Sequence, residues 1–129
     1  MGDRGSVYVV EPYHPERGVY LYTHWGCSTL PAAVQDALVQ AQEQWGGYRT
    51  NLAHFIYQAM VDREQSGCDI NSVCQDAPNY VLVVDPQHQL VGRGHGVDRS
   101  PTAAPDSLDP RWTFDEFLKL DPGKVWRLR

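Results

Sequence analysis

Near the start of the chain, two segments rich in strand-forming residues flank a stretch of turn-forming residues. Residues 6–10 and 19–23 are dominated by valine and tyrosine, and residues 11–18 between them include two prolines and a glycine. Valine and tyrosine favour pleated strands, whereas proline and glycine favour turns. The pattern predicts an antiparallel hairpin over residues 6–23.

Apolar residues then recur at helical spacing in two successive segments. The first is marked by Leu30, Val34, Leu38, Ala41 and Trp45, and the second by Leu52, Phe55, Ile56, Ala59 and Met60. Pro31 in the first turn and Gly46-Gly47 after the last turn bound the first helix, and the second begins after Thr50 or Asn51. The spacing predicts two helices that pack as a pair on one face of a sheet.

The second half of the chain alternates between strong and weak signals. Residues 80–84 form a continuous apolar run, which is typical of a strand buried on both faces, and residues 89–93 predict a weaker strand. Residues 94–111 contain three prolines and two glycines and predict a mobile loop. Thr113 and Glu116 have the spacing of a capping box, which predicts a short C-terminal helix.

These elements follow in the order β-β-α-α-β-β-α. The 129 residues, of which 42% are hydrophobic, suffice for one domain with a buried core. We therefore expect a single α+β domain over residues 1–129. A mainly antiparallel sheet of about four strands would pack against two helices, with a short C-terminal helix.

Charge and cysteine content restrict the classes of partner and the compartment. Sixteen acidic against eleven basic residues give a net charge of -5, which opposes binding to nucleic acid or to an anionic membrane. No run approaches the roughly 18 apolar residues of a membrane span, and the N-terminus lacks the apolar core of a signal peptide. The three cysteines are an odd number, which favours a reducing compartment. We expect a cytoplasmic protein.

The far end of the predicted hairpin is the first candidate site. If the turn is centred near His14, Arg4 comes opposite His24, and Asp3 and Trp25 join them at the start of the first helix. Arg4 would hold an anion, Trp25 would offer a stacking face, and His24 would donate a hydrogen bond or carry a proton. A structural interpretation competes with this one, in which Trp25 is core and His24 bridges the hairpin.

The stretch of residues 92–99 is the second candidate. Its glycines allow close backbone approach, and Arg93, His95 and Arg99 are suited to hold a phosphate or an acidic partner. The stretch matches no phosphate-binding loop motif, so a plain surface loop is the competing interpretation.

The cysteines suggest two kinds of chemistry that the spacing does not favour. Cys68 and Cys74 are six residues apart, wider than the ligand pairs of structural zinc sites, and we expect neither metal nor cofactor. Cys27 lies beside a helix start that would lower its pKa, with His24 as the one available base. A buried, unreactive thiol is the alternative.

Four short segments resemble a group of small uncharacterised proteins from bacteria and their phages. They are residues 1–4 (MGDR), 19–26 (VYLYTHWG), 82–85 (LVVD) and 114–117 (FDEF). The resemblance implies a phage or mobile-element context and transfers no catalytic role. Cys27 stands where that group would have a second glycine, which argues against an essential cysteine nucleophile.

Three hypotheses for function follow. The first is a non-enzymatic binding module for a small anionic ligand or a protein, such as a phage-associated accessory or inhibitory protein. The second is a small hydrolase or transferase acting on a phosphorylated or nucleotide substrate, with His24 and Asp3 as proton carriers and Arg4 holding the anion. The third is a structural subunit with an exposed patch of Tyr8, Tyr20 and Tyr22. The sequence does not specify the oligomeric state.

Overall fold

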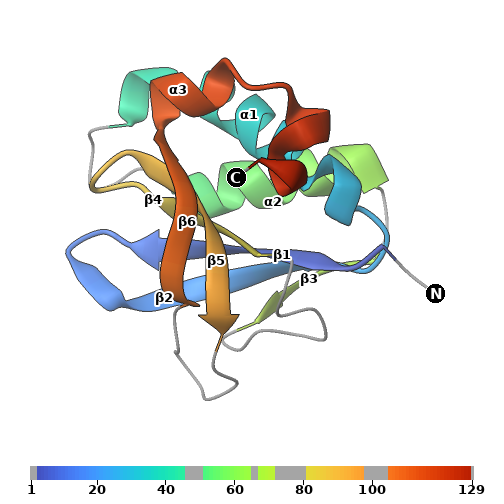
Figure 1. The fold of residues 1–129 in the computed structure, drawn as a ribbon, viewed down its shortest axis with the longest axis horizontal. Helices are drawn as coiled ribbons and strands as arrows, with labels where there is room; N and C mark the ends of the chain where they lie inside the picture. Colours follow the sequence, from blue (N-terminus) through green and yellow to red (C-terminus); the bar gives the residue numbers. More distant parts are fainter. Residues whose placement is uncertain (1–2, 46–50, 65–66, 72–80, 98–104, 129) are drawn as a thin grey trace.

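The computed structural model describes residues 3–45, 51–64, 67–71, 81–97 and 105–128, which form one α+β domain. Helices cover one face of a twisted sheet, and β5 and β6 run steeply across the direction of β1 and β2 (Figure 1). The strands are β1 (Gly5–Glu11), β2 (His14–Thr23), β3 (Cys68–Asn71), β4 (Val81–Asp85), β5 (Leu90–Val97) and β6 (Pro105–Thr113). The helices are α1 (Leu30–Gln40), α2 (Leu52–Glu64) and α3 (Phe114–Leu118), with the 3-10 helices η1 (Cys27–Thr29), η2 (Gln42–Gln44) and η3 (Pro122–Arg127).

The hairpin of β1 and β2 has the predicted register. Tyr8 pairs with Tyr20, and the ladder continues to Gly5 opposite Thr23. The strands are longer than expected, because the turn contains just Pro12 and Tyr13. The register then shifts between Val10 and Glu11, so that extra residues of β2 bulge from the ladder.

The sheet is mixed and has more strands than the four or so predicted, although most of its pairings are antiparallel as expected. Within the described residues it has six strands in the order β3-β2-β1-β4-β5-β6. β1 pairs with β4 in parallel, from Ser6 opposite Val81 to Val9 opposite Val84, and the other pairings are antiparallel. The apolar run of residues 80–84 correctly indicated that β4 is a central strand, with Val81–Val84 buried.

The two edge strands were not predicted from the sequence. β3 has four residues and a single large apolar side chain, Ile70, so it has no detectable period. The loop predicted over residues 94–111 is wrong for 94–97, which continue β5, and for 105–111, which belong to β6. Pro105 and Pro110 are compatible with β6 because it is an edge strand, where a missing N–H need not interrupt a ladder.

The helices form as the sequence pattern predicts, with small differences at their ends. α1 and α2 share one apolar core with the sheet and with α3. α1 ends at Gln40 rather than at Trp45, because a 3-10 turn takes over. The capping box of Thr113 and Glu116 is confirmed, and the rings of Trp112 and Phe117 lie 5.6 Å apart at the start of α3. Among the helices of the described ranges, none has the length and apolar character needed to cross a membrane.

A second, smaller core lies on the other face of the sheet. It contains Tyr8, Val10, Tyr20, Val81 and Val83. The rings of Tyr8 and Tyr20 are 4.6 Å apart, and both residues are fully buried. Tyr22 is buried as well, so the exposed tyrosine patch expected for a structural subunit is wrong.

Gly18 gives a direct test of how closely this second core is packed. A Cβ atom at Gly18 would lie 2.5 Å from the Val9 carbonyl oxygen and 2.5 Å from Cζ of Tyr8. The Gly18→Ala variant should lose about 1 to 3 kcal/mol of unfolding free energy, because the backbone of β1 would have to move. Urea denaturation measures this loss. Gly123→Ala is the control, since its nearest neighbour would be 3.4 Å away, and an equal effect in both variants would contradict the close approach.

Candidate functional site

The predicted hairpin corner forms where β1 begins and β2 ends. Asp3 accepts hydrogen bonds at Oδ2 from the Ser28 backbone N–H (2.9 Å) and hydroxyl (2.6 Å). Its carbonyl accepts from the Cys27 N–H at 2.9 Å, so Asp3 fastens the N-terminal segment to η1. Arg4 is exposed and directly precedes β1, and extension of the ladder beyond Gly5 and Thr23 places it opposite His24.

His24 and Trp25 form an aromatic cluster at the same corner. His24 is half-buried, and its Nδ1 lies 3.1 Å from the hydroxyl of Tyr22. The rings of His24 and Trp25 meet edge to face with centroids 4.3 Å apart. Trp25 is 53% exposed, which makes it a surface residue rather than a core residue. This cluster offers an exposed indole face beside a histidine whose Nδ1 already has a partner.

Cys27 is a buried thiol at this corner. Burial, together with the nearby carboxylate of Asp3, raises the pKa of Cys27 to about 12. The thiol is therefore protonated at neutral pH, which contradicts the idea that the helix start activates it. The Cys27 carbonyl accepts a hydrogen bond from the indole N–H of Trp126 at 2.9 Å, so η3 is attached here too.

The second candidate, around Arg93, is a strand rather than a loop. Arg93 belongs to β5, and its Nη1 donates to the carbonyl oxygens of Val125 (3.3 Å) and Trp126 (2.6 Å). These bonds hold the C-terminal η3 against the sheet. His95 also belongs to β5, but its side chain is outside the described part of the structure, as is all of Arg99. Arg93 thus holds η3 through its Nη1, and the predicted binding of a phosphate or an acidic partner by Arg93, His95 and Arg99 stays a prediction.

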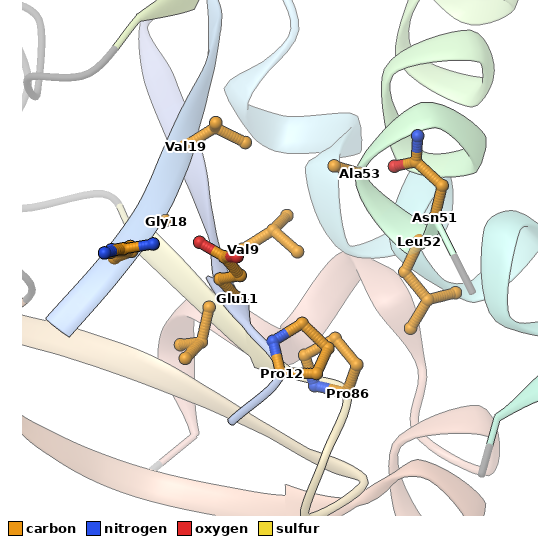
Figure 2. A pocket seen from close by; sticks show the side chains of 11 residues that line it. Val9, Glu11, Pro12, Gly18, Val19, Asn51, Leu52, Ala53 and Pro86 are labelled. Carbon is orange, nitrogen blue, oxygen red and sulfur yellow. The ribbon is translucent and has the colours of Figure 1, made fainter. Parts of the chain in front are cut away.

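A cavity of about 290 Å³ opens at the opposite end of the hairpin. We call it the hairpin–helix cavity. It is lined by Val9, Val10, Glu11, Pro12, Arg17, Gly18, Val19, Asn51, Leu52, Ala53 and Pro86. Figure 2 shows Val9 and Val19 from the hairpin on one side and Leu52 and Ala53 from α2 on the other. Its wall is therefore mostly aliphatic, and charged side chains enter its lining at Glu11 and Arg17.

The parallel pairing of β1 and β4 determines where this cavity lies. The carboxyl ends of both strands lie at the same end of the sheet. Pro12 after β1 and Pro86 after β4 therefore both reach the cavity. The two turns are joined, since the Tyr13 backbone N–H donates to Oε1 of Gln87 at 2.8 Å. Ligands commonly bind at the carboxyl ends of parallel strands, and this cavity has that location.

α2 begins at the cavity with its own cap. Oδ1 of Asn51 accepts a hydrogen bond from the His54 N–H at 3.1 Å, as an N-cap residue does. The positive end of the helix dipole faces the region where Arg17 also lies. A second cavity of about 260 Å³ shares Val19, Asn51 and Ala53 with the first and extends toward Ile70. The two cavities are therefore neighbours, and both are lined by residues of β2 and α2.

The sequence contains a weak signal for this cavity. Pro12 and Pro86 each follow a run of buried valines, and a proline at the end of a strand marks a tight turn. The two turns are more than seventy residues apart, so only the β1–β4 pairing shows that they meet.

In comparisons with known proteins, no family model, no curated sequence and no solved structure matched this chain. Its candidate site therefore has to be judged from the structure. Across the ranges that the structure covers, no three His, Cys, Asp or Glu side chains are grouped as a metal site would require.

The raised pKa of Cys27 predicts low reactivity and a specific pH dependence. The folded pKa of about 12 lies above the ordinary value of 9.0, so folding favours the protonated thiol. Its contribution to stability is complete below pH 9 and is lost as the pH rises toward 12. Cys27→Ala should therefore flatten the decline in unfolding free energy over this range.

Alkylation provides an independent measurement on the same thiol. At pH 8, iodoacetamide should label the partly exposed Cys68 before the buried Cys27, as peptide mass spectrometry can show. Rapid labelling of Cys27 in the folded protein would contradict the raised pKa.

Proposed function

We propose that this protein is a non-enzymatic binding module whose ligand is a small amphipathic anion held in the hairpin–helix cavity. The observation that carries the proposal is a mainly aliphatic cavity at the carboxyl ends of two parallel strands, with charge at its lining. Apolar cavities with a few polar groups are typical of small-molecule sites. The wider role as a phage-associated accessory or inhibitory protein stays a prediction based on the resemblance.

The aliphatic wall supports an apolar ligand body. Val9 and Val19 face Leu52 and Ala53 across the cavity (Figure 2). A volume of about 290 Å³ corresponds to about ten water-sized groups of about 30 Å³ each. A short alkyl chain or one small ring has this size, and its burial would provide the main part of the affinity.

The charges at the cavity support an anionic head group. Arg17 contributes a full positive charge and the start of α2 about half of one, whereas Glu11 contributes one negative charge. Among the described lining residues and the helix start, these charges sum to a small positive value. A carboxylate or phosphate near Arg17 and away from Glu11 would therefore be favoured over an ammonium group.

Filling the cavity should abolish binding. Octanoate matches the cavity in size and head group, and we expect it to stabilise the protein in a thermal-shift titration. At a hundred times its dissociation constant, a ligand adds about 2.7 kcal/mol of stability. Ala53→Phe should remove this stabilisation, because the phenyl ring would occupy the space between α2 and the hairpin.

The control for this variant is Val39→Phe. Val39 is 58% exposed on α1 and does not line the hairpin–helix cavity. It should respond to octanoate as the original protein does. Circular dichroism of both variants without ligand verifies the fold. Equal stabilisation of Ala53→Phe and the original protein by octanoate would exclude the cavity as the site.

Two charge-neutralising variants test the head group. Arg17→Gln should weaken octanoate binding by about two- to fivefold, the effect of an exposed ion pair worth about 0.5 to 1 kcal/mol. Glu11→Gln should leave binding unchanged or tighten it, because it removes the opposing charge. Isothermal titration with octanoate and with octylamine measures both effects. Preference for octylamine, with loss in Glu11→Gln, would contradict an anionic ligand.

A further inference from the structure

The outer edge of β3 is where the described sheet ends on the side of the hairpin. β3 pairs with β2 on one side, and it is the terminal strand in the sheet order. We propose that two copies of this chain associate through β3, strand against strand, about a two-fold axis at Ile70. No residue of β3 lines the hairpin–helix cavity, and the inference does not depend on the ligand.

The register with β2 determines which backbone groups of β3 point outward. The His24 N–H donates to the Gly67 carbonyl at 2.9 Å, which makes this a hydrogen-bonded pair of the antiparallel ladder. Hydrogen-bonded pairs alternate with non-hydrogen-bonded pairs. Asp69 therefore points its backbone groups toward β2, whereas Cys68 and Ile70 point theirs outward.

One of these outward groups already has a partner. The hydroxyl of Tyr57 on α2 donates to the Cys68 carbonyl at 3.2 Å. Desolvation, with Cys68 and Asp69 nearby, raises the pKa of Tyr57, so the hydroxyl keeps the proton that it donates. That leaves Ile70. Both its N–H and its C=O point away from β2, so neither takes part in the β2–β3 ladder. A single such residue suits the two reciprocal bonds of one pair.

The side chain of Ile70 provides an apolar contact at the same point. It is 53% exposed, and it lines the second cavity together with Tyr57. Residues directly opposite each other in an antiparallel pair share a face of the sheet. Two Ile70 side chains, one from each copy, would thus meet beside the two Tyr57 rings.

The charge of Asp69 favours a two-fold axis at Ile70 over one at Asp69. An axis at Asp69 would place the two Asp69 carboxylates directly opposite each other, which is destabilising. It would also require the Cys68 carbonyl, which Tyr57 already occupies. An axis at Ile70 places Asp69 opposite residue 71 of the second copy and avoids both conflicts.

The other edge of the sheet is different. β6 contains Pro105 and Pro110, which lack the N–H that strand addition requires. β3 contains no proline. Among the described strands, β3 is therefore the edge strand without a proline, and self-pairing there would join two sheets into one.

Sedimentation equilibrium of the full chain over a wide concentration series tests the proposal. The original protein should show a concentration-dependent monomer–dimer equilibrium. Ile70→Lys should weaken dimerisation by roughly tenfold or more, through the lost apolar contact and the opposed charges. Val39→Lys, at an equally exposed valine on α1, should dimerise as the original protein does.

A second variant separates pairing from folding. Ile70→Pro removes the outward N–H without removing a bond to β2, and it should yield a monomer whose circular dichroism and melting temperature are close to those of the original protein. A monomer at every concentration for the original protein, or undiminished dimerisation of Ile70→Lys, would overturn the proposal.

Crosslinking tests the register. Opposite residues of a hydrogen-bonded antiparallel pair have Cα atoms about 5.5 Å apart, within disulfide range. With Cys68 and Cys74 replaced by serine, Ile70→Cys should form a covalent dimer under mild oxidation, and Val39→Cys should not. Equal crosslinking of both variants would exclude the axis at Ile70.

Discussion

The parallel pairing of β1 with β4 is the interaction on which the rest of the structure depends. It joins two parts of the chain that are more than seventy residues apart and sets both strands at the centre of the sheet. Because the carboxyl ends of parallel strands lie at the same end of a sheet, the pairing brings the turn after β1 against the turn after β4. Tyr13 and Gln87 share a hydrogen bond there. The start of α2 lies at the same end of the sheet and completes the hairpin–helix cavity. Without this pairing, the turn after β4, with Pro86, would not reach the hairpin–helix cavity.

Burial of the central strands on both faces imposes the next constraint. Val7 and Val9 pack under the helices, whereas Tyr8 and Val10 pack in the second core on the opposite face. A hairpin buried on both faces has little space for a backbone irregularity, yet the register shifts after Val10. The chain accommodates this shift with a glycine at residue 18, where any side chain would collide with the Val9 carbonyl. The bulge then carries Arg17 to the cavity, so the local irregularity supplies a charged residue of the proposed site.

The sequence predicted the elements whose signals are local. The hairpin register followed from a turn placed near His14, the second helix from Asn51 and its apolar stripe, and α3 from the capping box. It did not predict the parallel pairing or β3, because these depend on partners distant in the sequence. The prolines that suggested a loop instead belong to an edge strand. Partners that are distant in the sequence also determine the candidate site. The sequence predicted Arg93 as a ligand-binding cation beside glycines, and it did not predict that Nη1 of Arg93 donates to the carbonyls of Val125 and Trp126.

The polar groups at the two ends of the hairpin differ in the contacts that they make. At the corner, Asp3 binds η1, and Trp126 binds the Cys27 carbonyl, so hydrogen bonds there attach both ends of the described chain to the sheet. A ligand competing for these groups would weaken the attachment that forms the corner. At the turn end, the walls are held by the β1–β4 ladder and by the cap of α2, and Arg17 lies outside those contacts in the bulge of β2. A ligand at this end would leave the β1–β4 ladder and the cap of α2 in place.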